Sequence, residues 1–229
     1  MSAVIIDVET TGTDDAAEVI EFASTSLIDS PSNVCLMTDE ITIADARFSS
    51  DRPISLGAMS IHHIIDEDLV GLRPFPGFDT SRGIEYIVGH NIDYDWRMMG
   101  RPKVRRICTF ALSRWLWPLI DSHTLGAMVY HLSRDKHQAR SMLRGAHSAK
   151  ADVECILDVV LPEILLKLHP RAKTWEQLWI ISEDARIPTV LSFGKHKGKP
   201  IGDVPGEYKR WLLSQPDIDP YLAIALKRS

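Results

Sequence analysis

The chain has 229 residues, of which 45% are hydrophobic and 25% charged, enough for one sizeable core and a small additional unit. It has no basic amino-terminal region leading into an apolar stretch, and no apolar run approaches about 18 residues. We therefore expect neither a signal peptide nor a membrane span, and a cytoplasmic location. The three cysteines include no Cys-x-x-Cys pair, which argues against a disulfide framework and against a thiolate zinc site.

The formal net charge of −5 is unevenly distributed along the chain. The first 46 residues contain ten acids and no Lys or Arg, which leaves 26 bases against 21 acids, or +5, for residues 47–229. An acidic segment that holds cations beside a basic remainder suits an enzyme that acts on phosphates. A charged, solvated surface is the alternative explanation.

Residues 4–12 place two carboxylates inside an otherwise apolar strand. Asp7 and Glu9 are two residues apart, so their side chains point to the same face. The near-continuous hydrophobicity of residues 3–8 predicts a central strand covered by helices, where two like charges repel unless a cation neutralises them. The pattern indicates a metal site, and the alternative is a strand end whose acids face water.

Two further strands are predicted over residues 19–28 and 34–43, joined by a turn at residues 30–33, to form an antiparallel meander with the first strand. A short helix over residues 54–64 carries His62 and His63. Adjacent helical residues diverge by about 100°, so the pair cannot easily share one metal. We favour a packing or substrate-edge role for them and assign His62, of the two, to face the site.

The apolar strand over residues 84–88 runs directly into a helix. Ligands in α/β folds gather at the carboxyl ends of strands, which makes Asp95 the candidate for a third carboxylate. Capping of the helix is the alternative role for an Asp here, and we expect it of Asp93. The basic residues between 97 and 106 form either solvated surface or a path for a phosphate backbone.

A short strand over residues 106–110 and helices over residues 111–117 and 122–132 are predicted as scaffold. A polar, basic segment then leads to His147. The helix that follows has an apolar stripe, with Ser148 as the predicted N-cap and Pro162 as a point of kinking. His147 and Asp152 are five residues apart, so both reach one site only if His147 lies on the loop before the helix.

Three motifs agree in order and spacing with those of a known family. Asp7-Val-Glu9-Thr-Thr-Gly12, His90-Asn91-x-x-Tyr94-Asp95 and His147-x-x-x-x-Asp152 resemble the motifs of the DnaQ-like 3′→5′ exonucleases of the DEDDh type. Other segments, including Phe193-Gly-Lys-x-x-Gly-Lys199, resemble the exodeoxyribonuclease X branch of that family, so the resemblance covers most of the chain. Tyr94 stands where the family usually has Phe, and Asp93 adds a charge beside Asp95.

The resemblance implies an α/β, ribonuclease-H-like fold with a mixed five-stranded sheet flanked by helices, in a domain over residues 1–170. It also implies hydrolysis with two Mg²⁺ ions, replaceable by Mn²⁺, about 4 Å apart. The resemblance assigns Asp7 to bridge the ions, Glu9 and Asp152 to the nucleophilic water, and Asp95 to the leaving-group side. His147 would take the proton of the water. Residues assigned to border the terminal nucleotide are Thr10, Thr11, His62 and Asn91.

Residues 171–187 are predicted to be a polar helical connector, and residues 188–229 a small basic α+β module with seven Lys or Arg against four Asp or Glu. The turn lysines, Lys195, Lys197 and Lys199, alternate, so on extended backbone they would line one face. The resemblance favours contact with a DNA backbone, and a solvated hairpin is the alternative.

The sequence thus predicts a metal-dependent 3′→5′ exodeoxyribonuclease that binds DNA as single strands or as 3′ ends of duplexes, without a membrane partner, and releases nucleoside 5′-monophosphates. Two alternatives remain. One is an RNA 3′-end trimming enzyme of the same superfamily, because discrimination at the 2′-hydroxyl depends on pocket geometry. The other is a non-catalytic nuclease-fold module that binds nucleic acid.

Overall fold

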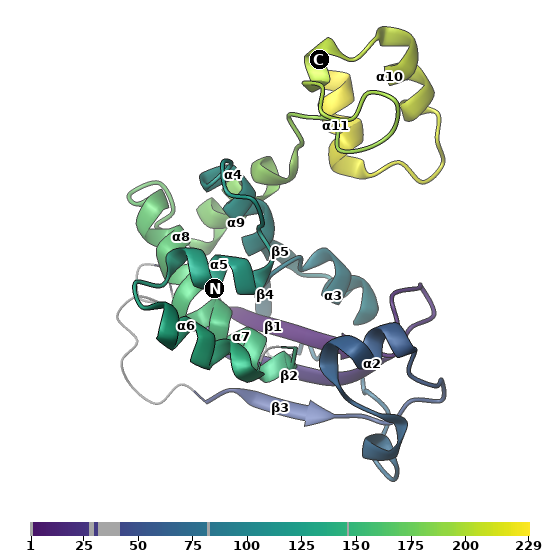
Figure 1. Ribbon diagram of the computed structural model, residues 1–229, viewed down its shortest axis with the longest axis vertical. Coiled ribbons are helices and arrows are strands. Elements are labelled where there is room, and N and C mark those ends of the chain that lie inside the picture. The colour runs from purple at the N-terminus through teal and green to yellow at the C-terminus, as the bar shows by residue number, and fades with distance from the viewer. Residues whose placement is uncertain (1, 28–29, 32–41, 82, 146) are drawn as a thin grey trace. The chain divides into compact units, whose positions relative to one another are not determined.

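The computed structural model describes residues 2–27, 30–31, 42–81, 83–145 and 147–229 (Figure 1). The chain forms two compact units, residues 1–182 and residues 183–229. The boundary falls within helix α9 (Trp175–Arg186), in the segment expected to connect the two parts. None of the helices in the described ranges is long and apolar enough to cross a membrane.

The first unit is built on a five-stranded mixed sheet in the order β3-β2-β1-β4-β5. Strands β1 (Ser2–Thr10), β2 (Val19–Leu27) and β3 (Ala44–Arg47) are antiparallel neighbours. Strands β4 (Ile84–Gly89) and β5 (Arg105–Cys108) continue the sheet in parallel with β1. Apolar side chains on both faces of β1 are buried, which confirms the predicted central strand and mixed sheet.

The third strand in the described residues begins just after the segment predicted as a strand. The strand expected over residues 34–43 lies almost entirely within 32–41, outside the residues that the structure describes, as does the second half of the predicted turn at residues 30–33. The strand that pairs with β2 is β3, four residues long, in which Arg47 lies opposite Glu21.

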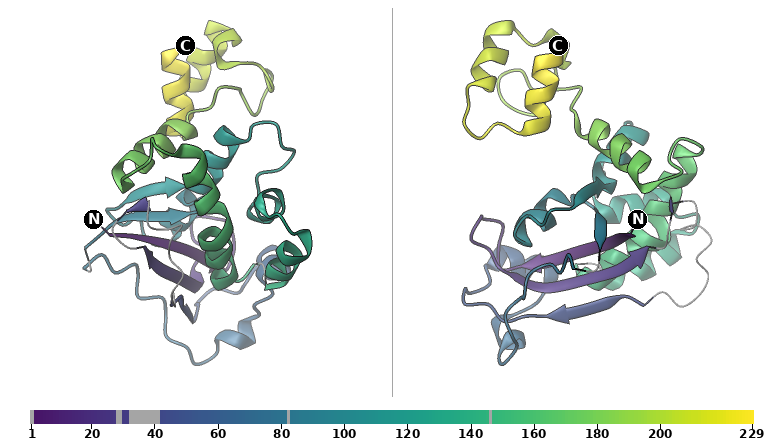
Figure 2. Two further views of the ribbon diagram at one scale, coloured as in Figure 1. Left: turned by 90° about the vertical axis from the view of Figure 1, so that its left-hand side faces the viewer. Right: turned by 180° about the vertical axis from the view of Figure 1, so that it is seen from behind.

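Helices cover the sheet (Figure 2). Helix α7 (Ala149–Cys155) packs on β1 and β2, α3 (Asp93–Met98) on β1 and β5, and α4 (Thr109–Leu116) on β4 and α8 (Leu161–Leu168). Among its described residues this unit also contains α2 (Leu56–His62), α5 (Leu125–Leu132) and α6 (Lys136–Met142), with 3₁₀ turns over Asp66–Leu69 and Leu143–Gly145. These elements place the carboxyl end of β1 beside the start of α7.

The predicted long helix after Ser148 is interrupted rather than simply kinked. A π-helical turn over Ile156–Val160 separates α7 from α8, and Pro162 lies in the first turn of α8. Proline lacks an N–H and its ring crowds the carbonyl four residues earlier, which favours a wider turn just before it.

The second unit has its own core, formed mainly by aliphatic side chains from α10 (Gly206–Leu213), α11 (Pro220–Arg228) and a 3₁₀ turn at Ile201–Asp203. Val190 and Pro200 form an isolated antiparallel bridge. Between them the chain turns: Gly194 and Gly198 have φ of 69° and 86°, and the Lys197 N–H donates to the Gly194 carbonyl at 3.2 Å. Lys195 and Lys197 therefore lie on a glycine-bounded turn and Lys199 directly after it, so the extended backbone on which the three lysines would line one face is not formed here.

Candidate active site

Three acidic side chains from two elements converge at the carboxyl end of β1. Asp7 and Glu9 project from β1, and Asp152 comes from α7, with carboxylate oxygens within 4.8 Å of one another. All three side chains are partly exposed, so a cation can reach them from solvent. A set of hard oxygen ligands at this spacing fits a divalent cation such as Mg²⁺ or Mn²⁺.

Asp95 lies next to this cluster, from α3, but is not among the three acids that share the 4.8 Å spacing. It is 4% exposed, and its Oδ1 accepts a hydrogen bond from the Val8 N–H at 3.1 Å. Gly89 allows α3 to start so close to β1, because a Cβ at that position would lie 3.1 Å from the Ile6 carbonyl oxygen. The bond to Val8 fixes Asp95 against the strand that carries Asp7 and Glu9.

Asp93 does not cap α3 as expected. The helix begins at Asp93 itself, with Ile92 in the N-cap position, and the Asp93 carboxylate accepts a hydrogen bond from Arg106 Nη1 at 2.7 Å. The guanidinium of Arg106 also stacks over the Trp96 ring, 4.1 Å from its centroid. The negative charge of Asp93 is thus paired with Arg106 of β5.

Burial and mutual repulsion raise the pKa of every carboxyl in the site. Burial is the largest cause each time, and it raises the pKa of Glu9 to about 8 and that of Asp95 to about 7. The pKa of Asp7 lies well above its usual range, through burial and then the charges of Asp95 and Asp152. Burial also raises the pKa of Asp152, against the lowering effect of a hydrogen bond from His147. Such a group of acids is held ionised most readily by a bound cation.

His147 lies on the loop immediately before α7, the position that the spacing to Asp152 requires. Its backbone has a left-handed φ of 65°, and its N–H donates to Asp152 Oδ1 at 3.4 Å. Ser148 caps the helix as predicted, since its Oγ accepts from the Ala151 N–H at 3.3 Å. The His147 side chain is exposed, so its imidazole is available to a substrate or a water molecule.

The residues expected to border the terminal nucleotide are largely engaged within the protein. His62 is 7% exposed, and its Nδ1 accepts from the Ile64 N–H, so its Nε2–H donates to the Thr10 carbonyl at 3.2 Å. Burial lowers the pKa of His62, which favours this neutral form. The Thr11 hydroxyl accepts from the Glu18 N–H at 3.0 Å. Asn91 is exposed, with φ of 72°.

Tyr94, the departure from the usual Phe, has a structural role here. Its hydroxyl donates to the Gly12 carbonyl at 2.7 Å and also contacts the Thr10 hydroxyl. The two contacts hold the segment that follows Glu9. The Thr10 side chain is therefore oriented inward, toward Gly12 and Tyr94.

The sequence analysis missed Glu21 of β2. This residue is 7% exposed and lies directly opposite Glu9 in the β1–β2 register. Its charge raises the pKa of Asp7, Glu9 and Asp152. The only sign of Glu21 in the sequence was an acidic residue between two apolar neighbours in a predicted strand.

Comparison with known proteins decides the family. Residues 4–160 match the RNase_T exonuclease family. The chain belongs to this exonuclease family. It is 30% identical to Exodeoxyribonuclease 10 of Escherichia coli (strain K12), over 97% of this chain and 96% of that protein. The family confirms the predicted relationship to DnaQ-like exonucleases, and the chain is a nuclease of the hydrolase class.

Solved structures agree with this assignment. Exonuclease X, in complex with 5′ overhanging duplex DNA, matches with a TM-score of 0.54 and 25% identity over 79% of this chain and 99% of that one. The zinc-bound complex of E. coli ExoI with single-stranded DNA has a TM-score of 0.54 at 16% identity, over 74% of this chain and 41% of that one, and shows the fold alone. Together they confirm the ribonuclease-H-like exonuclease fold. Exonucleases of this family depend on divalent metals, and the acidic cluster at the end of β1 has the oxygen ligands that such a metal needs.

Proposed function

We propose that this exonuclease is a 3′→5′ exodeoxyribonuclease that releases nucleoside 5′-monophosphates from DNA 3′ ends. The observation that carries the proposal is the convergence of Asp7, Glu9 and Asp152 within 4.8 Å, with His147 on the loop that leads into the helix of Asp152. The curated exodeoxyribonuclease that is 30% identical along nearly the whole chain supports DNA as the substrate.

The carboxylates of Asp7, Glu9 and Asp152 would hold Mg²⁺, with Mn²⁺ as a substitute, and Asp95 would complete the charge around the ions. Two bound ions would stabilise the charge that develops on the phosphate oxygens and lower the pKa of the attacking water. The Val8 N–H keeps Asp95 in place, and the end of β1 is held by Tyr94 and His62. These contacts fix the acids before substrate arrives.

His147 would act as the general base. Its side chain is exposed, its backbone N–H donates to Asp152, and a neutral imidazole at this position would accept the proton of the attacking water. The left-handed backbone of His147 directs the chain back toward Asp152 before α7 begins. The proposed base His147 and the proposed metal ligand Asp152 therefore lie in one short segment of the chain.

The second unit would contact the DNA backbone through the turn lysines, all of which are exposed. The turn rests on α10, since the Tyr208 ring lies 4.7 Å from that of His196 and 5.2 Å from that of Trp211. Phe193 and Trp211 are about half exposed on the same unit. Cations beside exposed aromatic rings suit single-stranded nucleic acid, with phosphates on the lysines and bases stacked on the rings.

A substrate panel tests the proposal. End-labelled single-stranded DNA, duplex DNA and RNA of one sequence are incubated with the full chain, each with and without Mg²⁺. We expect degradation of DNA that needs the metal. Faster loss of RNA would identify an RNA-trimming enzyme, and binding without degradation of any strand would identify a non-catalytic module.

A further inference from the structure

Glu21 is a buried acid at the centre of a row of charges that crosses the sheet. In the strand registers, Glu9 of β1 lies opposite Glu21 of β2, and Glu21 lies opposite Arg47 of β3. A buried carboxylate beside another acid is unfavourable unless it is paired and hydrogen-bonded. In the structure Glu21 has both an ion-pair partner and a further hydrogen-bond donor.

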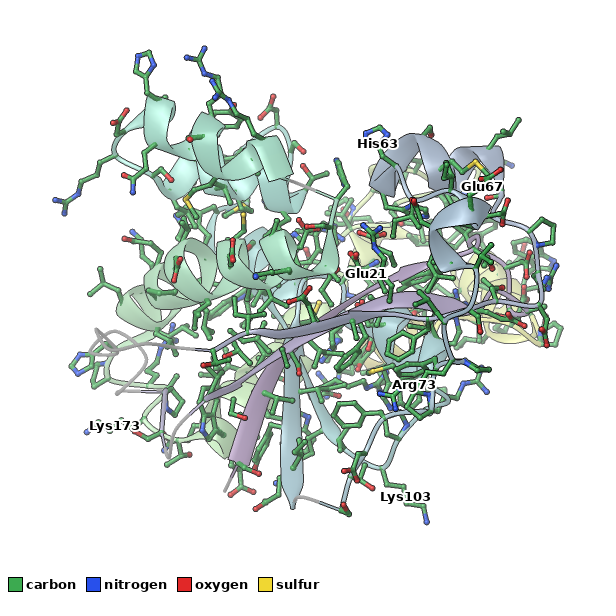
Figure 3. The ribbon with its side chains drawn as sticks, turned by 90° about the horizontal axis from the view of Figure 1, so that it is seen from below. Glu21, His63, Glu67, Arg73, Lys103 and Lys173 are labelled. Carbon is green, nitrogen blue, oxygen red and sulfur yellow. The ribbon has the colours of Figure 1, made fainter. Side chains whose placement is uncertain are left out.

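Glu21, labelled in Figure 3, has a defined hydrogen-bond donor at each carboxylate oxygen. Oε1 accepts from Arg47 Nε at 2.9 Å, and Oε2 accepts from the backbone N–H of Ala149 at 2.8 Å. Ala149 is the first residue of α7, whose first N–H groups have no partner within the helix. A carboxylate at this end also interacts favourably with the helix dipole. Glu21 therefore ties the start of α7 to β2, beside the acids of β1.

The residues around Ala149 are those that the proposed reaction uses. His147 lies two residues before it and Asp152 three residues after it. Glu21 is not part of the group of acids within 4.8 Å of one another among the described residues, and both of its oxygens already accept hydrogen bonds. Its contacts are those of a tether to α7 and not those of a metal ligand.

We propose that Glu21 is a positioning residue that fixes the first turn of α7, and through it His147, relative to the acids of β1. This inference depends on the proposed function, because it assumes that His147 takes part in hydrolysis. Removal of the tether lets the amino end of α7 shift, and a displacement of about 1 Å at a reacting group can cost about 10²-fold in rate.

The test is a double-mutant cycle between Glu21→Ala and His147→Ala in the full chain, with kcat and KM measured on single-stranded DNA. We expect Glu21→Ala to lower kcat about 10²-fold with little change in KM. In the His147→Ala background the same substitution should lower kcat by less than about tenfold, because the residue that Glu21 positions is gone. Glu21→Gln keeps an oxygen for the Ala149 N–H and should recover most of the activity.

Glu18→Ala is the matched control. The Glu18 carboxylate also accepts from a backbone N–H and a hydroxyl, those of Asp51 and Ser50, but has no contact with α7. It should leave kcat nearly unchanged. If Glu21→Ala unfolds the chain, Ala149→Pro removes the N–H that bonds to Glu21 at a first helical position that proline tolerates, and its cycle with His147→Ala supplies the test.

Equal losses from Glu21→Ala in both backgrounds would overturn the inference, as would a complete loss of Mn²⁺ binding in calorimetry for Glu21→Gln. This variant keeps the bond to Ala149, so such a loss would make Glu21 a ligand. A wild-type chain that degrades no DNA would instead refute the proposed function, so the two failures are distinguishable.

Discussion

Removal of one charge from the acidic cluster should stabilise the metal-free fold while abolishing hydrolysis. Glu9→Gln is the best substitution, because Gln has nearly the same shape as Glu and carries no charge. The folded pKa of Glu9 is about 8 against an ordinary value of 4.5, through burial and the charges of Asp152, Glu21 and Asp95. A carboxyl whose folded pKa is raised destabilises the fold above its unfolded pKa, and most strongly above its folded pKa.

The size of the effect follows from this difference. The folded and ordinary pKa values of Glu9 differ by about 3.5, and each pKa unit corresponds to about 1.4 kcal/mol. The charge of Glu9 therefore destabilises the fold by at most about 5 kcal/mol at pH 9. At pH 6 the folded carboxyl is protonated, and only the gap from 4.5 to 6 counts, about 2 kcal/mol. Glu9 is partly exposed to solvent, which screens its interactions, so we expect about half of each value.

Urea unfolding in the presence of EDTA, at pH 9 and at pH 6, measures the difference in the free energy of unfolding between Glu9→Gln and wild type. Glu9→Gln should be more stable than wild type by about 2.5 kcal/mol at pH 9 and by about 1 kcal/mol at pH 6. Mg²⁺ at about 100 times its Kd should stabilise wild type by about 2.7 kcal/mol and the variant much less. Glu18→Gln, whose carboxylate bonds to Ser50 and Asp51, should show no gain. A Glu9→Gln variant that is less stable than wild type at pH 9 without metal would refute this reasoning.

Three further predictions concern activity and binding. Asp7→Ala, Asp95→Ala and Asp152→Ala should each nearly abolish Mg²⁺-dependent hydrolysis with the circular dichroism spectrum unchanged, and near-full activity of Asp95→Ala would remove that acid from the site. His147→Ala should lower kcat by about 10²–10⁴-fold, with a smaller loss at high pH where hydroxide supplies the nucleophile; complete loss of Mn²⁺ binding in calorimetry would make it a ligand instead. Replacement of all three turn lysines by Ala should reduce the slope of log K against log salt by about 2, because each phosphate contact contributes about 0.7. Fluorescence anisotropy on single-stranded DNA measures this slope, with Asp7→Ala present to block hydrolysis. An unchanged slope would leave the turn lysines as solvated surface.

Local patterns predicted the parts of the site that local geometry controls. The two-residue alternation of a strand was enough to place Asp7 and Glu9 on one face, and the capping preference of Ser was enough to set His147 just outside α7. Asp95 followed from the rule that ligands gather at strand ends.

Contacts between distant segments could not be predicted in this way. Glu21 and Ala149 are 128 residues apart, and nothing near either residue indicates their hydrogen bond. The ion pair of Asp93 with Arg106 likewise overrode the preference of Asp for capping. At residues 194–198 two glycines with positive φ form a turn, and the alternation of the lysines did not by itself show whether their backbone is extended.

The direction of degradation tests the central claim most directly. One oligodeoxynucleotide is labelled at its 5′ end in one sample and at its 3′ end in another, and each is followed over time with Mg²⁺. We predict that the 3′ label is released first as a nucleoside 5′-monophosphate, while the 5′ label moves down a ladder of steadily shorter strands. Release of the 5′ label as a mononucleotide while the 3′ label stays on long fragments would contradict the account.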